Sequence, residues 1–256
     1  MLVHRGRHDG LPEDVVAAVA SALSGLVTAA DAVPNAVIAE ACVCLEALWT
    51  FTEPMVGCGS AAKDVLWKCL GFLQSSTWEA AGVREAAAGV IKALLVRSSF
   101  VESHVTTKHV MHALCAAVTR HAAVHESRVV ETALHCVCMF WTDACGGLER
   151  DVLTAVLRVL HYAPIAPGTG AAFAVCSALR CLVHMVEVAG VPLGPSVAER
   201  LLIAVLRVMA LCAGSRAVMA ALCVAAAERL LARVQLPISP RCQGVVARFD
   251  LHATTA

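Results

Sequence analysis

The feature that most constrains this chain is a repeat of about 45 residues in the signals that open helices. Pro, Gly, Ser and acidic residues mark these openings, and between them apolar residues recur at i, i+3, i+4 and i+7. No stretch shows the alternation that is typical of a strand. The expected helices begin near residues 12, 34, 59, 77, 104, 126, 149, 170, 195 and 215. Such regular spacing indicates stacked helical pairs, so we predict an all-α chain of about five two-helix units.

The second helices of the pairs resemble one another in detail. Three of them have an aliphatic residue two places before a glutamate, continue with small residues and end on a large apolar pair. They read VIAEACVCLEALW (37–49), VREAAAGVIKALL (83–95) and VVETALHCVCMFW (129–141). The first helices repeat too, as in DVLTAVLRVL (151–160) and AERLLIAVLRVM (198–209). Small residues in mid-helix let neighbouring helices approach closely, and the large pair fills the wider end of the stack.

These segments resemble the armadillo and HEAT repeat families. Residues 37–49 look like the last helix of an armadillo repeat, and residues 83–94 look like the second helix of a HEAT repeat. The resemblance covers about residues 12–233 and implies a right-handed α-α superhelix whose second helices line a concave, protein-binding face. The Asn that many peptide-binding armadillo proteins carry on this helix is missing from all the repeats, so we expect no asparagine ladder for an extended peptide. We expect an N-terminal loop at 1–11 and a C-terminal tail at 234–256 on either side of the repeats.

Composition excludes several classes of protein. Hydrophobic residues make up 59% of the 256 residues, which is ample for a core and excludes a disordered chain. Lys and Arg together number 20, as do Asp and Glu, and this balance argues against a general nucleic-acid binder. The longest charge-free stretch, residues 159–179, is broken by Pro and Gly, so we expect no membrane insertion.

The cysteines indicate the cellular compartment in which the protein functions. There are 13, an odd number, and most lie in apolar helical patterns rather than in a short disulfide framework. No secretory signal opens the sequence. Because a free cysteine behaves as a small buried hydrophobe, we expect a reducing, cytoplasmic location.

The second helices provide the candidate binding surface. Burying the apolar stripe of each helix leaves a sparse set of polar side chains on its other face. These are Glu40, Glu46, Arg84, Glu85, Lys92, Glu131, His135, Arg180, His184, Glu187 and Glu228. We interpret them as a mixed-charge groove, acidic at its N-terminal end, that selects a partner protein; an ordinary solvated helix face is the alternative.

Histidine and cysteine clusters raise the question of a metal site. His109, His112 and Cys115 are spaced at i, i+3 and i+6, so neighbouring pairs share a helix face. No fourth ligand is evident, and the set turns around the helix. We therefore expect packed, hydrogen-bonded histidines and no metal ion.

Two C-x-C pairs and one glycine-rich segment have equally ordinary interpretations. The members of Cys42/Cys44 and of Cys136/Cys138 point to nearly opposite helix faces, so we expect core thiols rather than metal ligands. The segment 168–170, Gly-Thr-Gly, follows no strand and lacks the lysine of a phosphate-binding loop. Nucleophile signatures such as Gly-x-Ser-x-Gly are missing from the sequence, so we expect neither catalytic residues nor a cofactor.

The two ends of the predicted stack lack the polar outer face that a terminal repeat needs. Residues 15–27 carry no charge, and residues 217–227 are apolar nearly all round. We expect a cover for at least one end: the tail with Val245, Val246 and Phe249, a second copy, or a partner protein.

The leading prediction is a non-catalytic protein-interaction or scaffold module that binds a partner along the concave face. The first alternative is a structural subunit of a larger, for example cytoskeletal, assembly that associates through its apolar end helices. A metal-binding or enzymatic protein that uses the His and Cys positions is the lesser alternative.

Overall fold

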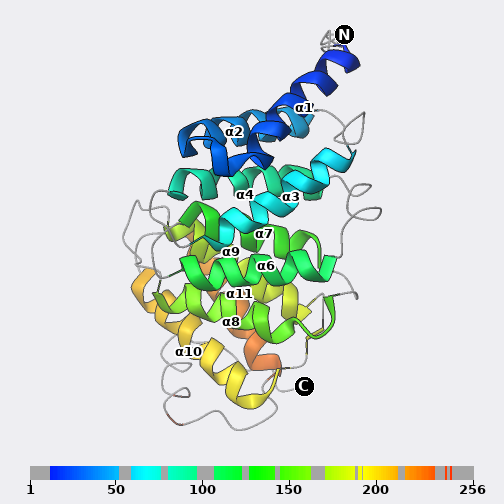
Figure 1. Ribbon diagram of the computed structural model, residues 1–256. Helices are drawn as coiled ribbons and strands as arrows, with labels where there is room; N and C mark the ends of the chain where they lie inside the picture. The colour runs from blue at the N-terminus through cyan, green and yellow to red at the C-terminus, as the bar shows by residue number, and fades with distance from the viewer. Residues whose placement is uncertain are drawn as a thin grey trace, which may run out of the picture. The chain divides into compact units, whose positions relative to one another are not determined.

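The chain is helical wherever the structure describes it at length. The computed structural model describes residues 12–51, 59–75, 80–96, 107–122, 127–141, 145–162, 171–187, 190–191, 193–212, 217–233, 240 and 243. Within these residues it contains ten α-helices, one short 3-10 helix and no strand (Figure 1). The predicted all-α class is therefore confirmed.

The helix bounds follow the predicted openings closely. The helices are α1 Glu13–Thr28, η1 Ala30–Ala32, α2 Asn35–Phe51, α3 Gly59–Gln74, α4 Ala81–Val96, α6 Thr107–His121, α7 Ser127–Met139, α8 Glu149–Tyr162, α9 Ala171–Glu187, α10 Pro195–Cys212 and α11 Ala217–Arg233. The largest difference is at α4, whose predicted start is near residue 77. Local chemistry explains why three helices begin at or next to the predicted residue. Helices α1 and α8 have acidic residues in the first turn, and α10 begins with a proline.

The chain divides into two compact units. Unit 1 comprises Met1–Phe72 and Trp78–Val105, and unit 2 comprises Leu73–Thr77 and Thr106–Ala256. In unit 1, α1 packs on α2 and α2 packs extensively on α4. Leu45 and Trp49 of α2 are fully buried in this core, and the stretch 86–91 of α4 is buried on every side.

Unit 2 is built from helical pairs that pack in two layers. The pairs are α6 with α7, α8 with α9 and α10 with α11. Helices in corresponding positions also pack on each other: α6 on α8 and α8 on α10, which we call the first layer, and α7 on α9 and α9 on α11, which we call the second layer (Figure 1). Contacts between helices about 45 residues apart are what stacked helical pairs predict.

Burial corrects one expectation about the thiols. Cys42 is buried but Cys44 is exposed, so the prediction that both lie in the core is wrong for Cys44. Cys42 and Cys44 point to nearly opposite faces of α2, as expected for residues i and i+2. Only the face that carries Cys42 is covered at this point, so Cys44 is left at the surface. Cys136 is buried and Cys138 is half-buried, in better agreement with the prediction.

The predicted cap involves residues at the two ends of the chain. Residues 1–11, Val245, Val246 and Phe249 lie outside the described part of the chain. Of the tail only Pro240 and Gln243 are described, and both are exposed. Among the helices that the structure describes, none combines the length and the apolar character needed to cross a bilayer.

The contact between α2 and α4 has one especially close point. A Cβ built on Gly89 of α4 would overlap the carboxylate of Glu46 on α2. On α3, by contrast, Gly71 is exposed and a Cβ there would meet no atom within 4 Å.

We predict that Gly71→Ala raises the free energy of unfolding by about 0.5–1 kcal/mol, because alanine has the higher helix propensity. Gly89→Ala should raise the free energy of unfolding by less, because the Glu46 carboxylate has to move aside. Replacing Glu46 by Ala should restore the full gain at position 89. Urea unfolding of the single and double variants measures these differences, and equal gains at position 89 with and without Glu46 would contradict the close contact.

Candidate binding site on the first layer

The sequence Ala-Val-x-Arg occurs once in each first-layer helix. It spans residues 117–120 of α6, 155–158 of α8 and 204–207 of α10. In each case the Ala and the Val are buried and the Arg is exposed. The small apolar pair therefore lies in the interior, and the arginine lies at the surface of the same helix. We call Arg120, Arg158 and Arg207 the arginine row.

Each arginine of the row binds a main-chain carbonyl near the end of an earlier helix. Nη1 of Arg158 donates to the Thr119 carbonyl at 3.4 Å, and Nη1 of Arg207 donates to the His161 carbonyl at 2.9 Å. Nη1 of Arg120 donates to the carbonyl of Gln74, a residue that belongs to unit 2. The last carbonyls of a helix lack intrahelical partners and carry partial negative charge, so a guanidinium stabilises them.

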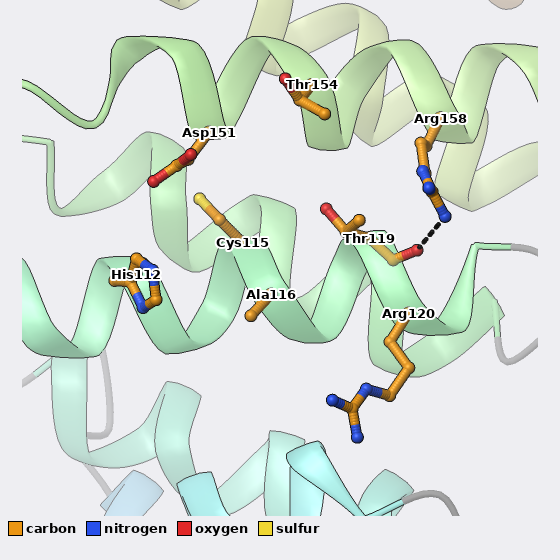
Figure 2. A pocket seen from close by; sticks show the side chains of 8 residues that line it. All are labelled: His112, Cys115, Ala116, Thr119, Arg120, Asp151, Thr154 and Arg158. Carbon is orange, nitrogen blue, oxygen red and sulfur yellow. Dashed lines mark hydrogen bonds between the residues drawn. The ribbon is translucent and has the colours of Figure 1, made fainter.

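A first hollow lies between α6 and α8, and we call it the α6–α8 hollow. Its volume is about 450 Å³. It is lined by His112, Cys115, Ala116, Thr119, Arg120, Asp151, Thr154 and Arg158. Figure 2 shows Asp151 and Thr154 on α8 across from Cys115 and Thr119 on α6, with the Arg158–Thr119 hydrogen bond at one end. The carboxylate of Asp151 offsets part of the positive charge here.

A second hollow lies between α8 and α10, and we call it the α8–α10 hollow. Its volume is about 520 Å³. It is lined by Leu157, Arg158, His161, Tyr162, Arg200, Ile203, Ala204 and Arg207. Arg158 borders both hollows, so they adjoin. The lining residues of the second hollow include three arginines and no carboxylate, and therefore this hollow is the more basic of the two.

Apolar surface accompanies these arginines. Tyr162 is 49% exposed and Ile203 is 42% exposed, and the ring of His161 meets the ring of Tyr162 edge-on with centroids 4.9 Å apart. Guanidinium groups hold carboxylates and phosphates through paired N–H donors. The α8–α10 hollow can therefore hold an anionic group while it covers a neighbouring apolar side chain.

The predicted binding residues of unit 1 lie on α2 and α4. Glu40, Glu85 and Lys92 are exposed, and Glu46 is half-buried against Gly89. The prediction that Arg84 lies on the exposed face is wrong, because its side chain is only 3% exposed. The cause is the enclosure of α4, whose neighbouring positions are buried almost all round.

The predicted binding residues of unit 2 lie on the second layer. His135 of α7, Arg180 and Glu187 of α9 and Glu228 of α11 are exposed, whereas Glu131 and His184 are half-buried. Glu187 forms an ion pair with Arg229 of α11, a residue outside the predicted set. Part of this polar set therefore links α9 to α11, and its role as a partner-binding surface stays a prediction.

Several thiols are held in the protonated form. Burial raises the pKa of Cys115 to about 12, with further contributions from Asp151 and Cys145. The hydrogen bond with Cys42, together with burial, raises the pKa of Cys69 well above its ordinary value. Cys181 has a raised pKa as well, through its hydrogen bond with Cys138 and through burial. These thiols are therefore poor sources of thiolate at neutral pH.

The prediction that His109 and His112 are packed is wrong. His109 and His112 are exposed, but Cys115 is buried. Across the described part of the chain, no group of three His, Cys, Asp or Glu side chains is placed so that it could hold a metal ion.

Comparison with known proteins finds no match: no protein-family model, no curated protein and no solved structure is significantly similar to this chain. The fold class therefore rests on the helices described above, and the armadillo or HEAT assignment stays a prediction.

The arginine row was not predicted from the sequence, although a signal for it is present. The five residues AVLRV occur at both 155–159 and 204–208, within first helices that repeat. The resemblance to armadillo and HEAT repeats points to the second helices as the binding face. The repeated arginines of the first helices were therefore not among the predicted binding residues.

The raised pKa of Cys115 predicts a loss of stability in alkaline solution. Its thiol ionises near pH 9.0 in the unfolded chain but only near 12 in the folded one. Raising the pH above about 9 therefore favours the unfolded state, and stability falls progressively up to about pH 12. We expect Cys115→Ala to reduce the drop in unfolding free energy between about pH 8 and about pH 10 by about 1 kcal/mol. Chemical denaturation of the natural chain and of the variant at the two pH values measures these free energies. Equal decreases in the two proteins would contradict the raised pKa of Cys115.

Proposed function

We propose that this protein is a non-catalytic protein-binding module, built as an armadillo- or HEAT-like α-α solenoid in the cytoplasm. The two-layer packing of α6 to α11 supports the architecture, because corresponding helices of successive pairs contact each other. The free cysteines among the described residues support a reducing compartment.

One observation carries the binding proposal: two adjoining hollows run along the first layer and share the arginine row. Arginine and tyrosine are enriched at protein interfaces, where they combine charge or polarity with a large contact area. In the α8–α10 hollow, Arg200 and Arg207 would orient acidic groups of the partner. Contact with Ile203 and Tyr162 would then supply much of the affinity.

The arginines and Cys115 among the lining groups are suited to binding rather than to catalysis. A guanidinium stays protonated at any physiological pH and cannot act as a general base. The Cys115 thiol, with its pKa of about 12, is not a nucleophile at neutral pH.

A second candidate function is a structural subunit that associates through its end helices. The exposed Val15, Val19 and Leu26 on α1 favour it, because they leave an apolar face uncovered within unit 1.

We predict that reversing one charge in the α8–α10 hollow removes partner binding. Affinity capture from cell extract would compare the natural 256-residue chain with Arg200→Glu. The matched control is Arg180→Glu, the same reversal at an exposed position on the second layer. Proteins retained in stoichiometric amount by the natural chain should be lost with Arg200→Glu and kept with Arg180→Glu.

The opposite pattern, loss only with Arg180→Glu, would move the binding surface to the second layer. Recovery of no stoichiometric partner by any of the three proteins would contradict the proposed function.

A further inference from the structure

The N-terminal helices of this chain carry charge of one sign. Residues 12–51, which form α1, η1 and α2, contain no lysine and no arginine. Their charged side chains are Glu13, Asp14, Asp31, Glu40 and Glu46. Since the chain as a whole has a formal net charge of zero, this acidic stretch is balanced by basic residues elsewhere. Arg5 and Arg7 precede this stretch and lie outside the described residues.

Helix α1 has few buried residues for its length. Its buried residues are Ala20, Ser24 and Val27. Val15 is 40% exposed and Val19 is 43% exposed, and the spacing of i and i+4 puts them on one face. Glu13 and Asp14, both exposed, lie in the first turn. Because residues i and i+2 point to nearly opposite faces of a helix, Glu13 lies opposite Val15, and Asp14 lies on the side between them. The start of α1 thus presents two carboxylates on one side and an apolar strip on the other.

The α8–α10 hollow is the complement of that surface. Arg158, Arg200 and Arg207 contribute guanidinium groups, and Ile203 and Tyr162 contribute exposed apolar surface. Although Arg158 and Arg207 each use Nη1 for a main-chain carbonyl, a guanidinium has five N–H donors, so each retains donors for a ligand. Arg200 is exposed as well.

We propose that the first turn of α1 of one copy docks in the α8–α10 hollow of a second copy. The proposal rests on the binding site of the proposed function and names a second copy as its occupant. On one side of the docked turn the carboxylates of Glu13 and Asp14 accept hydrogen bonds from the arginines, and on the other side Val15 and Val19 cover Ile203 and Tyr162. A match in both charge and apolar surface favours this occupant over an acidic segment chosen by charge alone.

Such docking is heterologous, because the two contacting surfaces differ. Each copy offers one acidic helix start and one basic hollow, so every added copy leaves a free surface of each kind. Contacts of this type extend head to tail unless the geometry closes a ring. We therefore expect mass to grow with concentration.

The first test is light scattering on the purified 256-residue chain from about 1 μM to about 1 mM. The average mass should rise with concentration. It should return towards the monomer value of 26.7 kDa when ionic strength increases from about 0.01 M to about 1 M, because salt screens the charge pairs. Association that strengthens with salt would overturn the proposal and favour contact through apolar end helices instead.

Charge reversal on each surface sharpens the test. The helix variant is Glu13→Lys/Asp14→Lys, and the hollow variant is Arg200→Glu/Arg207→Glu. Each alone should weaken association by at least about tenfold, since like charges then face each other. Matched controls on the second layer, Glu228→Lys and Arg180→Glu, should associate like the natural chain. If the loss of the Arg207 hydrogen bond unfolds the hollow variant, as judged by circular dichroism, the single change Arg200→Glu replaces it.

A mixture of the two variants gives the decisive result. The acidic α1 of the hollow variant meets the intact hollow of the helix variant, and the two reversed surfaces also complement each other. The equimolar mixture should therefore associate at concentrations at which each variant alone is still monomeric. A monomeric mixture, or a natural chain that is monomeric at every concentration and salt, would overturn the proposal. The proposed function fails separately, through the capture experiment on Arg200→Glu with a partner other than this chain.

Discussion

The packing of successive helical pairs on one another is the interaction on which the rest of unit 2 depends, and in the first layer it brings α6 into contact with α8 and α8 into contact with α10. Each of these three helices carries a buried Ala-Val pair followed by an exposed arginine. The approach of one helix to the next lets an arginine on one of them reach the last carbonyls of the other, which have no partner within their own helix. The hydrogen bonds of Arg158 and Arg207, 39 and 46 residues along the chain from their acceptors, are a consequence of that approach.

The same contact produces the candidate binding site. Because the Ala-Val pair lies in the interior, the arginine three residues on from the alanine lies at the edge, beside the hollow between two helices. A guanidinium there serves two purposes at once: some of its donors stabilise a helix end, and the others face solvent. This arrangement concentrates positive charge on the first layer of a chain whose charges balance overall. Binding chemistry at this site is therefore a by-product of how the helices stack, which explains why it repeats with them.

Polar residues elsewhere take part in packing as well. Glu46 lies against the backbone of α4 at Gly89, and Glu187 of α9 pairs with Arg229 of α11. Arg84 is enclosed within unit 1. A polar side chain on a helix in a stack is thus a poor guide to a partner-binding surface on its own, because the neighbouring helix can be its partner. The buried thiols show the same dependence, since the pKa of Cys181 is set largely by Cys138 on another helix.

The sequence by itself determined the class of the fold and the positions of its helices. Caps, prolines, glycines and the apolar period act within a few residues of one another, so the starts of α3, α8 and α10 could be predicted to the residue and most others to within a few residues. Their regular spacing also predicted that helices would pair. Only the tertiary structure decided which side of each helix is covered: it buried Arg84, exposed Cys44 and brought Arg207 to His161. The physical reason is that burial and side-chain contacts depend on neighbours about 45 residues away, whose distance and rotation local sequence does not specify.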